Sequence, residues 1–492
     1  MTAQLGWLTP EHAAVLPTTV ALPVVAAFVV LLLRNKPNVR ELVSLVAGVA
    51  VAALVVSLWP VVGDDLQFEM WTWLPGLSLA FRLEPLGLLF ATVAGVLWPV
   101  TTLYSIGYMR GNREQRQARF YCFFALAIAA ALWIAFSANL VTLFIGYEML
   151  TLATWPLVTH HDDEKAKRGG RVYLVILLTT SICLLLPAII WTWLIAGTTD
   201  FVEGGILRAR AGPGIMTVLV FLYAFGIGKA ALMPFHWWLP SAMVAPTPVS
   251  ALLHAVAVVK AGVFAVLKIV IYIFGIDALR SADAATPMMW VTAFTLLVAG
   301  LVAITRDNLK ARLAYSTVSQ LAYIVLAAML ANDVAAAGGA LHIVTHAVGK
   351  ITLFFCAGAI HTAAHKTKVS ELDGLGRAMP WTFGAFFIAS VSIVGLPPLG
   401  GTWSKWLLLL GAAKDIQPVM VILLLLGSLL ALAYLMPIPI RAFFRPPPQP
   451  LHHGEAPVAC VVPLVLTALA GVALFFFPDA LIAPISEVLG AP

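Results

Sequence analysis

Charge is scarce in this chain. Only 11% of its 492 residues are charged and 61% are hydrophobic, whereas soluble globular domains carry about 25% charged residues. The mean hydropathy of +0.96 agrees with this deficit. Apolar runs of about 20 residues, each long enough to cross a bilayer, recur from one end to the other. The composition therefore argues against a soluble enzyme and predicts a single all-α membrane domain.

Cysteine is also scarce. The four cysteines stand alone in separate apolar segments, and no two of them have the CxxC spacing of zinc or iron–sulfur ligands. No basic patch with interleaved aromatic residues occurs, so we expect no cofactor, no metal and no nucleic-acid partner. Ahead of the first apolar run there is no basic stretch of the kind that opens a cleavable signal peptide, so the first span is expected to act as an uncleaved insertion signal.

The apolar runs predict about fourteen transmembrane helices. Nineteen of the 29 lysines and arginines fall in loops that follow odd-numbered spans, five fall in the other loops and five fall inside spans. By the positive-inside rule, the basic loops face the cytoplasm and both termini lie outside an inner (plasma) membrane. The predicted spans are 13–33, 41–62, 85–107, 119–136, 138–157, 171–197, 213–240, 248–272, 287–304, 309–331, 334–362, 380–411, 417–440 and 456–478.

Two predicted spans are interrupted, the seventh by Pro234 and Pro240 and the twelfth by the GLPPLGG sequence of residues 395–401. A proline frees a backbone carbonyl, which in lipid must find another partner. Broken helices five spans apart and in opposite orientations indicate two inverted repeats with sites at the breaks; two packing kinks would give the same pattern. The predicted divisions are 1–118 for helices 1–3 with an external hairpin at 63–84, 119–272 for the first repeat, 287–445 for the second repeat, and 446–492 for helix 14.

The hairpin is predicted from alternation. Residues 63–84 alternate apolar and polar side chains, which is typical of strands rather than of a helix. We expect this segment outside the membrane, with Trp71 and Trp73 near the interface.

Charges inside the spans are the strongest functional signal. Among the 23 acidic residues only Glu148 is expected to lie deep in a span. Each such charge costs about 2.5–3.5 kcal/mol on the insertion scale, so one carboxylate and five lysines cost roughly 15–20 kcal/mol. Structural stability does not explain that cost, so a functional role is the default interpretation. The five lysines are Lys229, Lys260, Lys268, Lys350 and Lys405.

Glu148 in span five and Lys229 before the first break have similar predicted depths. As the only deep carboxylate, Glu148 is the only strong acidic partner expected for any of these lysines. We expect a switchable ion pair that gates a proton path; the alternative is a fixed salt bridge that only holds two helices together. Lys260 is expected to carry protons, with His254 beside it as a relay or as a hydrogen-bonded packing residue. Lys268, two turns further on, can instead snorkel to the outer surface.

His342, His346 and Lys350 are spaced by four residues and share one helix face. Two histidines at this spacing can bind zinc, but no third ligand with a partner carboxylate follows. A proton wire through neutral imidazoles suits them better, because imidazole exchanges protons near neutral pH. Lys405, after the second break, is expected to end this polar stripe. A desolvated lysine releases its proton readily and a nearby carboxylate holds it, so such a chain can move protons without a redox centre.

Several stretches resemble a known family. They are GYEML in span five, GIGKAALMPFHWWLP in span seven, APTPVSALLHAVAVVKAGVF in span eight, LKARLAYSTVSQLAYIV, the HxxxHxxxK stripe and GLPPLGGTWSKW. In order and spacing, over about residues 80–420, they resemble the antiporter-like subunits of respiratory complex I and its relatives. Within that family the chain most resembles the D-type subunits of the multi-subunit Mrp-type sodium/proton antiporters.

The resemblance implies fourteen helices with two inverted five-helix repeats, each forming a half-channel. It also implies roles for the residues above: Glu148 as the helix-five glutamate, Lys229 as its partner, Lys260 as the central lysine with His254 beside it, His342, His346 and Lys350 as the second half-channel, and Lys405 as its terminal charge. Ser241 stands where many relatives have an aspartate after WLP, so a role for an acid there is absent. The chain ends soon after its last predicted span, which favours the D-type over the largest antiporter-like subunit with its long lateral helix.

We therefore expect a component of a multi-subunit monovalent cation (Na⁺)/proton antiporter, embedded in lipid beside other integral membrane subunits. The same lysine path would serve a proton-pumping subunit of a membrane-bound hydrogenase or NADH dehydrogenase relative. In that case the chain would be part of a translocase without carrying the redox chemistry itself. The lysine path would also serve a subunit of an inorganic-carbon uptake complex. The genes adjacent to this one distinguish the three alternatives.

Overall fold

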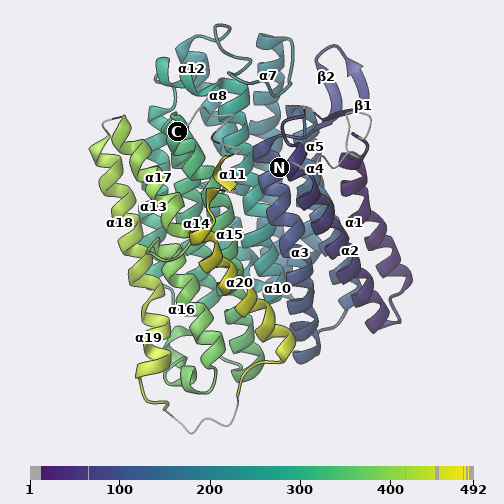
Figure 1. Cartoon of the computed structure of the whole chain (residues 1–492), viewed down its shortest axis with the longest axis vertical. Coiled ribbons are helices and arrows are strands. Elements are labelled where there is room, and N and C mark those ends of the chain that lie inside the picture. Colours follow the sequence, from purple (N-terminus) through teal and green to yellow (C-terminus); the bar gives the residue numbers. More distant parts are fainter. Residues whose placement is uncertain are drawn as a thin grey trace.

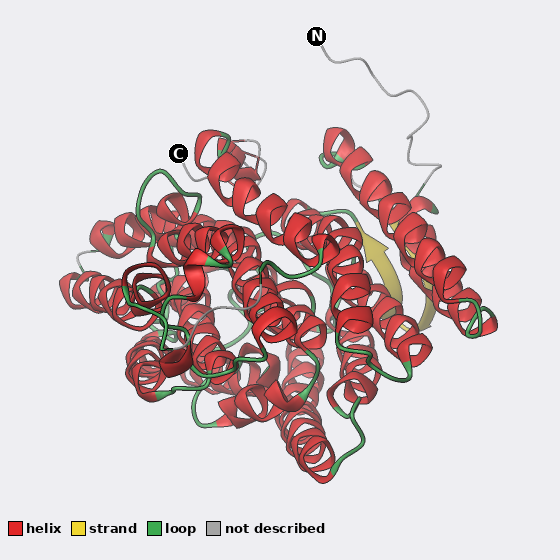
Figure 2. Cartoon of the chain, turned by 90° about the horizontal axis from the view of Figure 1, so that it is seen from below, coloured by secondary structure: helices red, strands yellow, loops and turns green. Residues whose placement is uncertain are grey.

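The structure is a computed structural model that describes residues 13–64, 66–415, 417–448, 454–479, 481–483 and 486. These residues form one bundle of helices that stand side by side, with a short hairpin at one end (Figure 1, Figure 2). Residues 1–12, which hold most of the segment expected to lack a cleavable signal, lie outside the described residues.

The elements follow one another in the order of the predicted spans. Up to the first break they are α1 (Val15–Leu32), α2 (Pro37–Ser57), η2 (Trp59–Val61), β1 (Gln67–Leu74), β2 (Leu77–Arg82), α3 (Pro85–Gly111), α4 (Gln117–Ala135), α5 (Leu140–Val158), α6 (Glu164–Thr180), η3 (Ser181–Leu185), α7 (Leu186–Ala196) and α8 (Pro213–Gly226). Between the breaks they are η4 (Gly228–Ala230), η5 (Phe235–Trp237), α9 (Trp238–Ser241), η6 (Ala242–Val244), α10 (Thr247–Ala251), η7 (Leu252–Val256), α11 (Val258–Ile269), η8 (Val270–Phe274), α12 (Ile276–Ser281), α13 (Thr286–Thr305), α14 (Leu309–Met329), α15 (Asp333–Ala364), η9 (Val369–Glu371), η10 (Leu375–Arg377) and α16 (Pro380–Val394). After the second break come α17 (Gly401–Lys414), α18 (Pro418–Leu435), α19 (Pro437–Phe444) and α20 (Val458–Phe476).

Within the described residues, eleven helices are long and apolar enough to cross a membrane. Helices α8 and α16 are shorter apolar helices that each end at a break. Helix α14 has 21 residues, begins at Leu309 and carries Lys310 and Arg312 in its first turn. The polytopic all-α class is therefore confirmed, whereas the count of fourteen spans and the division into two repeats stay predictions.

The predicted hairpin is present. Strands β1 and β2 pair antiparallel, from Gln67 opposite Arg82 to Leu74 opposite Leu77. Gly76 in the turn has a φ of +77°, a conformation that glycine adopts without strain. Backbone hydrogen bonds fix the second strand to the link between α4 and α5; one of them runs from the Ala138 nitrogen to the Ala80 carbonyl at 2.9 Å.

Both predicted helix breaks are present, and side chains satisfy the carbonyls that they free. After α8 the chain is irregular as far as Pro234, and the indole nitrogen of Trp238 donates to the Gly228 carbonyl at 2.9 Å. At the second break, between α16 and α17, the Lys405 ammonium donates to the Val394 carbonyl at 3.2 Å. Both arrangements answer the requirement that backbone polar groups within a membrane be paired inside the protein.

Two segments form the centre of the bundle. Residues 247–276, from α10 through α11 and η8 into the start of α12, are all buried, and so are residues 334–360 of α15. Figure 1 shows α11 and α15 in the middle, with α18 at one edge and α1 and α2 at the other. These two segments carry His254, Lys260, Lys268 and the HxxxHxxxK stripe, so the surrounding helices shield those side chains from lipid.

The basic loops gather at one end of the bundle, which we call the basic end. There Asn112, after α3, donates to the Thr362 hydroxyl of α15 at 2.8 Å, and Arg441 of α19 pairs with Asp373 at 2.7 Å. The hairpin lies at the opposite end (Figure 1). This grouping agrees with the predicted topology; the side of the membrane that each end faces stays a prediction.

Candidate functional site

Lys229 lies on η4, the short turn that follows α8 at the first break. Its side chain is fully buried, and its ammonium donates to the Tyr147 carbonyl at 2.8 Å and to the Thr151 hydroxyl at 2.6 Å. The ammonium also lies 3.1 Å from the centroid of the Tyr147 ring, a cation–π contact. The Lys229 backbone nitrogen donates to the Tyr147 hydroxyl at 3.0 Å, so one tyrosine fixes both ends of the residue.

Glu148 lies on α5 between the two residues that hold Lys229. Both of its carboxylate oxygens are buried and accept no hydrogen bond from any described residue. No nitrogen–oxygen distance of 4.0 Å or less joins Glu148 to Lys229, so the structure has the two residues near each other without an ion pair. The predicted gating pair therefore stays a prediction.

Lys268 differs from the expectation in two ways. It does not snorkel to the surface, because its side chain is fully buried and donates to the Ser137 carbonyl at 2.6 Å. It also has an acidic partner, Glu84, with the ammonium 3.0 Å from the carboxylate. The expectation that Glu148 is the only carboxylate available to these lysines is therefore wrong. Glu84 precedes the first residue of α3, so a count of residues inside apolar runs misses it.

Lys260 connects the two central helices. Its ammonium forms a hydrogen bond with Nδ1 of His346, which joins α11 to α15. Two residues further along, Gly262 packs directly against the first break, because a Cβ atom there would lie 2.4 Å from the Lys229 carbonyl carbon. One turn of α11 therefore contacts both the Lys229 segment and the histidine stripe.

His254 lies on η7, a π-helical turn that the sequence analysis did not predict. Its ring packs 4.7 Å from the Phe354 ring, and neither ring nitrogen has a hydrogen-bond partner among the described residues. The residue that hydrogen-bonds to Lys260 is therefore His346, and the role of His254 beside Lys260 stays a prediction. Such π turns occur often at functional sites; here the wider turn places an unpaired imidazole six residues before the central lysine.

The stripe on α15 continues toward the second break. The His342 and His346 rings stack with their centroids 5.7 Å apart. Nδ1 of His342 lies 2.9 Å from the Ser404 hydroxyl of α17, the residue next to Lys405. Lys405 itself donates to the Ser428 hydroxyl of α18 at 2.9 Å. A buried series of polar side chains thus runs from α11 through α15 to α17 and α18.

Lys350 leaves this series although it shares the helix face. Its ammonium donates to the Leu313 carbonyl at 3.2 Å and to the Ser316 hydroxyl at 2.6 Å, both on α14. One turn further along α14, Gln320 is fully buried and its amide faces the Tyr434 hydroxyl of α18. Gln320 was not among the predicted site residues, although a buried amide in an apolar helix is a signal that could have found it.

Metal ligands are not gathered in the described residues. No group of three or more histidine, cysteine or acidic side chains there is placed to hold a metal ion. The four cysteines are free, with Cys183 exposed and the other three buried.

Comparisons with known proteins agree on one family. The family model described as "NADH:quinone oxidoreductase/Mrp antiporter, TM" matches residues 137–431. The chain is 28% identical to the N-type subunit of the NADH-quinone oxidoreductase of Desulforudis audaxviator, covering 97% of this chain and 98% of that protein. It is 30% identical to the A/B-type subunit of a probable K(+)/H(+) antiporter of Rhizobium meliloti, covering 90% of this chain and 45% of that protein.

Two solved structures share the fold. A chain of the Mrp complex from Dietzia sp. has a TM-score of 0.86 at 20% identity, with 97% of both chains covered. A chain of the membrane-bound sulfane sulfur reductase, an archaeal respiratory membrane complex, has a TM-score of 0.85 at 22% identity, with 98% of both chains covered. At these identities the likeness establishes the fold alone.

Proposed function

Since this chain belongs to the NADH:quinone oxidoreductase/Mrp antiporter transmembrane family, we propose that its buried lysines and histidines carry protons between the two helix breaks. The chain is an antiporter-like, multi-pass membrane subunit of that superfamily. In the proposed path Lys229 is loaded near Glu148, Lys260 and His346 transfer the proton between central helices, and the proton leaves by way of Lys405.

The observation that carries this proposal is the contact between Lys260 and His346. A proton on the lysine ammonium can move to Nδ1 of His346, which leaves a neutral amine and an imidazolium. The imidazolium then releases its other proton from Nε2, an atom that has no partner among the described residues. An imidazole is suited to this step because it accepts and releases protons near neutral pH. Both residues are buried, so this step is sheltered from lipid.

We further propose that the complex is a multi-subunit Na⁺/proton antiporter of the inner membrane, with both termini outside and other integral membrane subunits as partners. The 30% identity to a protein named as part of a probable K(+)/H(+) antiporter supports an antiport assembly. The gathering of basic loops at one end supports the orientation. Exchange of Na⁺ rests on the sequence resemblance to the D-type subunits of Mrp antiporters.

The second candidate is a proton-pumping subunit of a redox complex. It is favoured by the match to the N-type subunit of an NADH-quinone oxidoreductase, which covers nearly the full length of both proteins. In that assembly the same buried series would move protons while partner subunits supply the electron transfer.

Inside-out membrane vesicles from cells that express the whole complex test both candidates. In vesicles acidified by ATP hydrolysis, addition of NaCl or KCl should collapse the pH gradient if the complex is an antiporter. Proton uptake that needs an added electron donor instead identifies the redox pump. In either case Lys260→Ala should lower the rate by about tenfold or more, with the exposed Lys414→Gln as the matched loss of charge. Wild-type rates in assembled Lys260→Ala would overturn the proposed path.

A further inference from the structure

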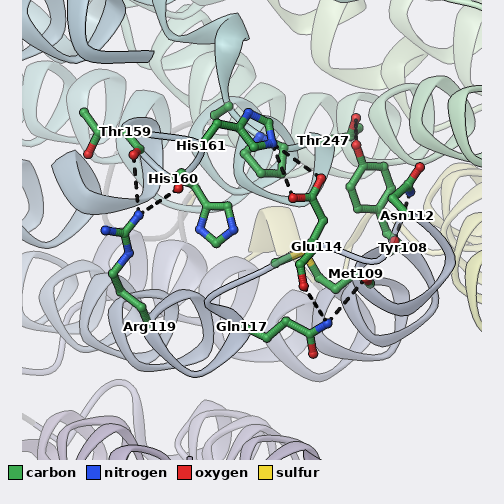
Figure 3. Close-up of polar contacts among 12 residues, drawn as sticks. Tyr108, Met109, Asn112, Glu114, Gln117, Arg119, Thr159, His160, His161 and Thr247 are labelled. Carbon is green, nitrogen blue, oxygen red and sulfur yellow. Dashed lines mark hydrogen bonds and ion pairs between the residues drawn. The ribbon is translucent and has the colours of Figure 1, made fainter. Parts of the chain in front are cut away.

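A second group of titratable side chains lies at the basic end, where the proposed path does not reach. Glu114 comes from the α3–α4 link, His160 and His161 come from the α5–α6 link, and His361 and His365 come from the end of α15. In Figure 3 the Glu114 side chain points toward His161, with Tyr108 and Thr247 on its other side. Residues far apart in the sequence thus converge on one carboxylate, which we call the Glu114 cluster.

Hydrogen bonds hold the two links in place. Nε2 of His161 lies 3.4 Å from the Glu114 carboxylate. Gln117 donates to the Glu114 backbone carbonyl at 3.0 Å, and Arg119 donates to the His160 backbone carbonyl at 2.9 Å. The Glu114 side chain is 15% exposed and that of His161 is 37% exposed, so the pair lies where water meets the buried helices. His160 is buried, and its Nδ1 has no partner among the described residues.

The surroundings of these groups shift their pKa values in different directions. The hydrogen bond that the His161 ring donates to the Glu114 carboxylate raises the pKa of His161. Burial alone raises the pKa of Glu114, but its hydrogen bond to His161 and the charge of that ring outweigh burial, and the pKa is lowered. Burial lowers the pKa of His160 to about 4, so this ring stays neutral. The cluster therefore combines a charged pair at its mouth with a neutral imidazole beside it.

Polar groups lead from the cluster toward the central helices. The Thr247 hydroxyl donates to the Tyr108 hydroxyl at 3.4 Å, and the Tyr108 ring stacks on His361 with centroids 6.3 Å apart. Nδ1 of His361 is buried and has no partner in the described part of the chain. Thr247 begins the continuous buried helix in which His254 follows seven residues later. The unpaired rings of His361 and His254 thus mark a direction from the basic end to Lys260.

We propose that the Glu114 cluster is the proton-loading site of the basic end, and that it supplies His254 and then Lys260; this rests on the proposed function. A proton from water binds His161 to form an imidazolium, which the Glu114 carboxylate stabilises. The imidazolium then gives a proton, through water, toward His361 and His254 and becomes a neutral ring again. The titratable and charged groups that face the cluster are Tyr108, Arg116, Arg119, His160, Asp162, Lys167, Lys310, His361 and His365.

The pH range follows from the two shifts at the mouth. The pKa of His161 is raised above its ordinary 6.5. The stability that its charged ring adds to the folded chain is therefore complete below pH 6.5 and is lost as the pH rises through the raised pKa. The pKa of Glu114 is lowered from 4.5. The stability that its carboxylate adds to the folded chain is therefore present above pH 4.5 and is lost as the pH falls through the lowered pKa. Proton capture by His161 is therefore centred at a higher pH than that of an ordinary imidazole.

The test measures the transport rate of the intact complex in vesicles as a function of pH on the basic side. Glu114→Gln removes the carboxylate that holds the His161 proton. The pH of half-maximal rate should move about one unit lower, while the maximal rate at low pH stays within about twofold of wild type. His161→Gln, at a half-exposed site that tolerates substitution, should flatten the dependence near neutral pH. Asp373→Asn, the same charge change in the Arg441 pair of the basic end, is the control and should leave the profile unchanged.

The outcomes separate this inference from the function on which it rests. An unshifted pH profile in both variants, or an equal fall in rate at every pH, overturns the loading site. If Glu114→Gln fails to assemble, His161→Gln alone decides. Lys260→Ala is measured beside them. If it transports at the wild-type rate, the proposed function fails; if it is inactive while the cluster variants keep the wild-type profile, only the loading site fails.

Discussion

Lys268 and Lys229 are both fully buried, and each has a carboxylate in its vicinity, but they are held in different ways. Lys268 lies on the regular helix α11 and forms a direct ion pair with Glu84 at 3.0 Å. Lys229 lies on a short turn between irregular residues and is held by a carbonyl, a hydroxyl and an aromatic ring, without an ion pair to Glu148. The ion pair with Glu84 leaves Lys268 no second partner of comparable strength. Lys229, in contrast, still has Glu148 as a possible second partner.

The difference separates a structural charge from a mobile one. A buried ion pair in which both partners sit on rigid elements stays closed, because opening it leaves two charges unpaired in a medium of low dielectric constant. At the first break Lys229 has only neutral contacts, and we propose that it exchanges between them and the nearby Glu148. A gate requires that second arrangement.

The largest expected effect is on the closed pair. Glu84→Gln leaves the Lys268 ammonium buried without its counter-charge, and breaking one partner of a buried pair costs about 3–5 kcal/mol. We expect a marked loss of assembled complex and a lower thermal midpoint in detergent. The double variant Glu84→Gln with Lys268→Met removes both charges and should recover much of the lost stability.

The stability of the double variant decides whether Glu84 and Lys268 act as a structural pair. If the double variant is as unstable as the single one, the loss comes from packing around Glu84, and the pair does not act as described. If Glu84→Gln is stable but transports slowly, Glu84 belongs with the functional charges, and the comparison between the two lysines no longer holds.

The next effect concerns the open site. Glu148→Gln removes a carboxylate whose oxygens accept no hydrogen bond from the described residues. The free energy of unfolding should therefore change by no more than about 1 kcal/mol, whereas the transport rate should fall by about tenfold or more because the lysine has lost its alternative partner. Assembly is followed by the yield of intact complex and transport by vesicle assays.

An assembled Glu148→Gln complex that transports at the wild-type rate would rule out the gate. A variant that fails to assemble would place Glu148 in the same structural class as Glu84, contrary to the difference drawn between them.

The sequence predicted the fold class, the hairpin and both helix breaks because each depends on local chemistry: apolar length, alternation, and proline or glycine within a span. It also predicted that the HxxxHxxxK residues share one helix face. It did not predict that His346, His342 and Lys350 contact three different helices, since a helix face spans a wide arc and the neighbours across it come from distant parts of the chain.

The partner of Lys268 was missed for a related reason. Glu84 lies just before the first residue of α3, where an analysis of apolar runs places the surface, but the folded bundle covers that helix end with the link between α4 and α5 and with α11. The π turn at His254 was missed because it depends on packing around the central helix and has no proline or glycine to mark it. Burial set by tertiary packing is the information that a single span does not contain.

The smallest expected effect concerns the neutral contacts that hold Lys229 open. Thr151 accepts a hydrogen bond from the lysine ammonium at 2.6 Å and lies three residues after Glu148 on α5. Thr151→Val keeps the shape and removes the hydroxyl, so the lysine loses one of its two oxygen acceptors and its balance moves toward the carboxylate. We expect about a threefold lower transport rate at unchanged assembly, a change of about 0.7 kcal/mol in the barrier. Thr151→Ser keeps the hydroxyl and should transport nearly as wild type.

In the double variant Thr151→Val with Glu148→Gln, the threonine change should add nothing further, because the lysine then has no carboxylate to move toward. Additive losses in that double variant would mean that Thr151 acts independently of the Glu148–Lys229 exchange. The neutral contacts of Lys229 would then be structural, as the Glu84–Lys268 pair is.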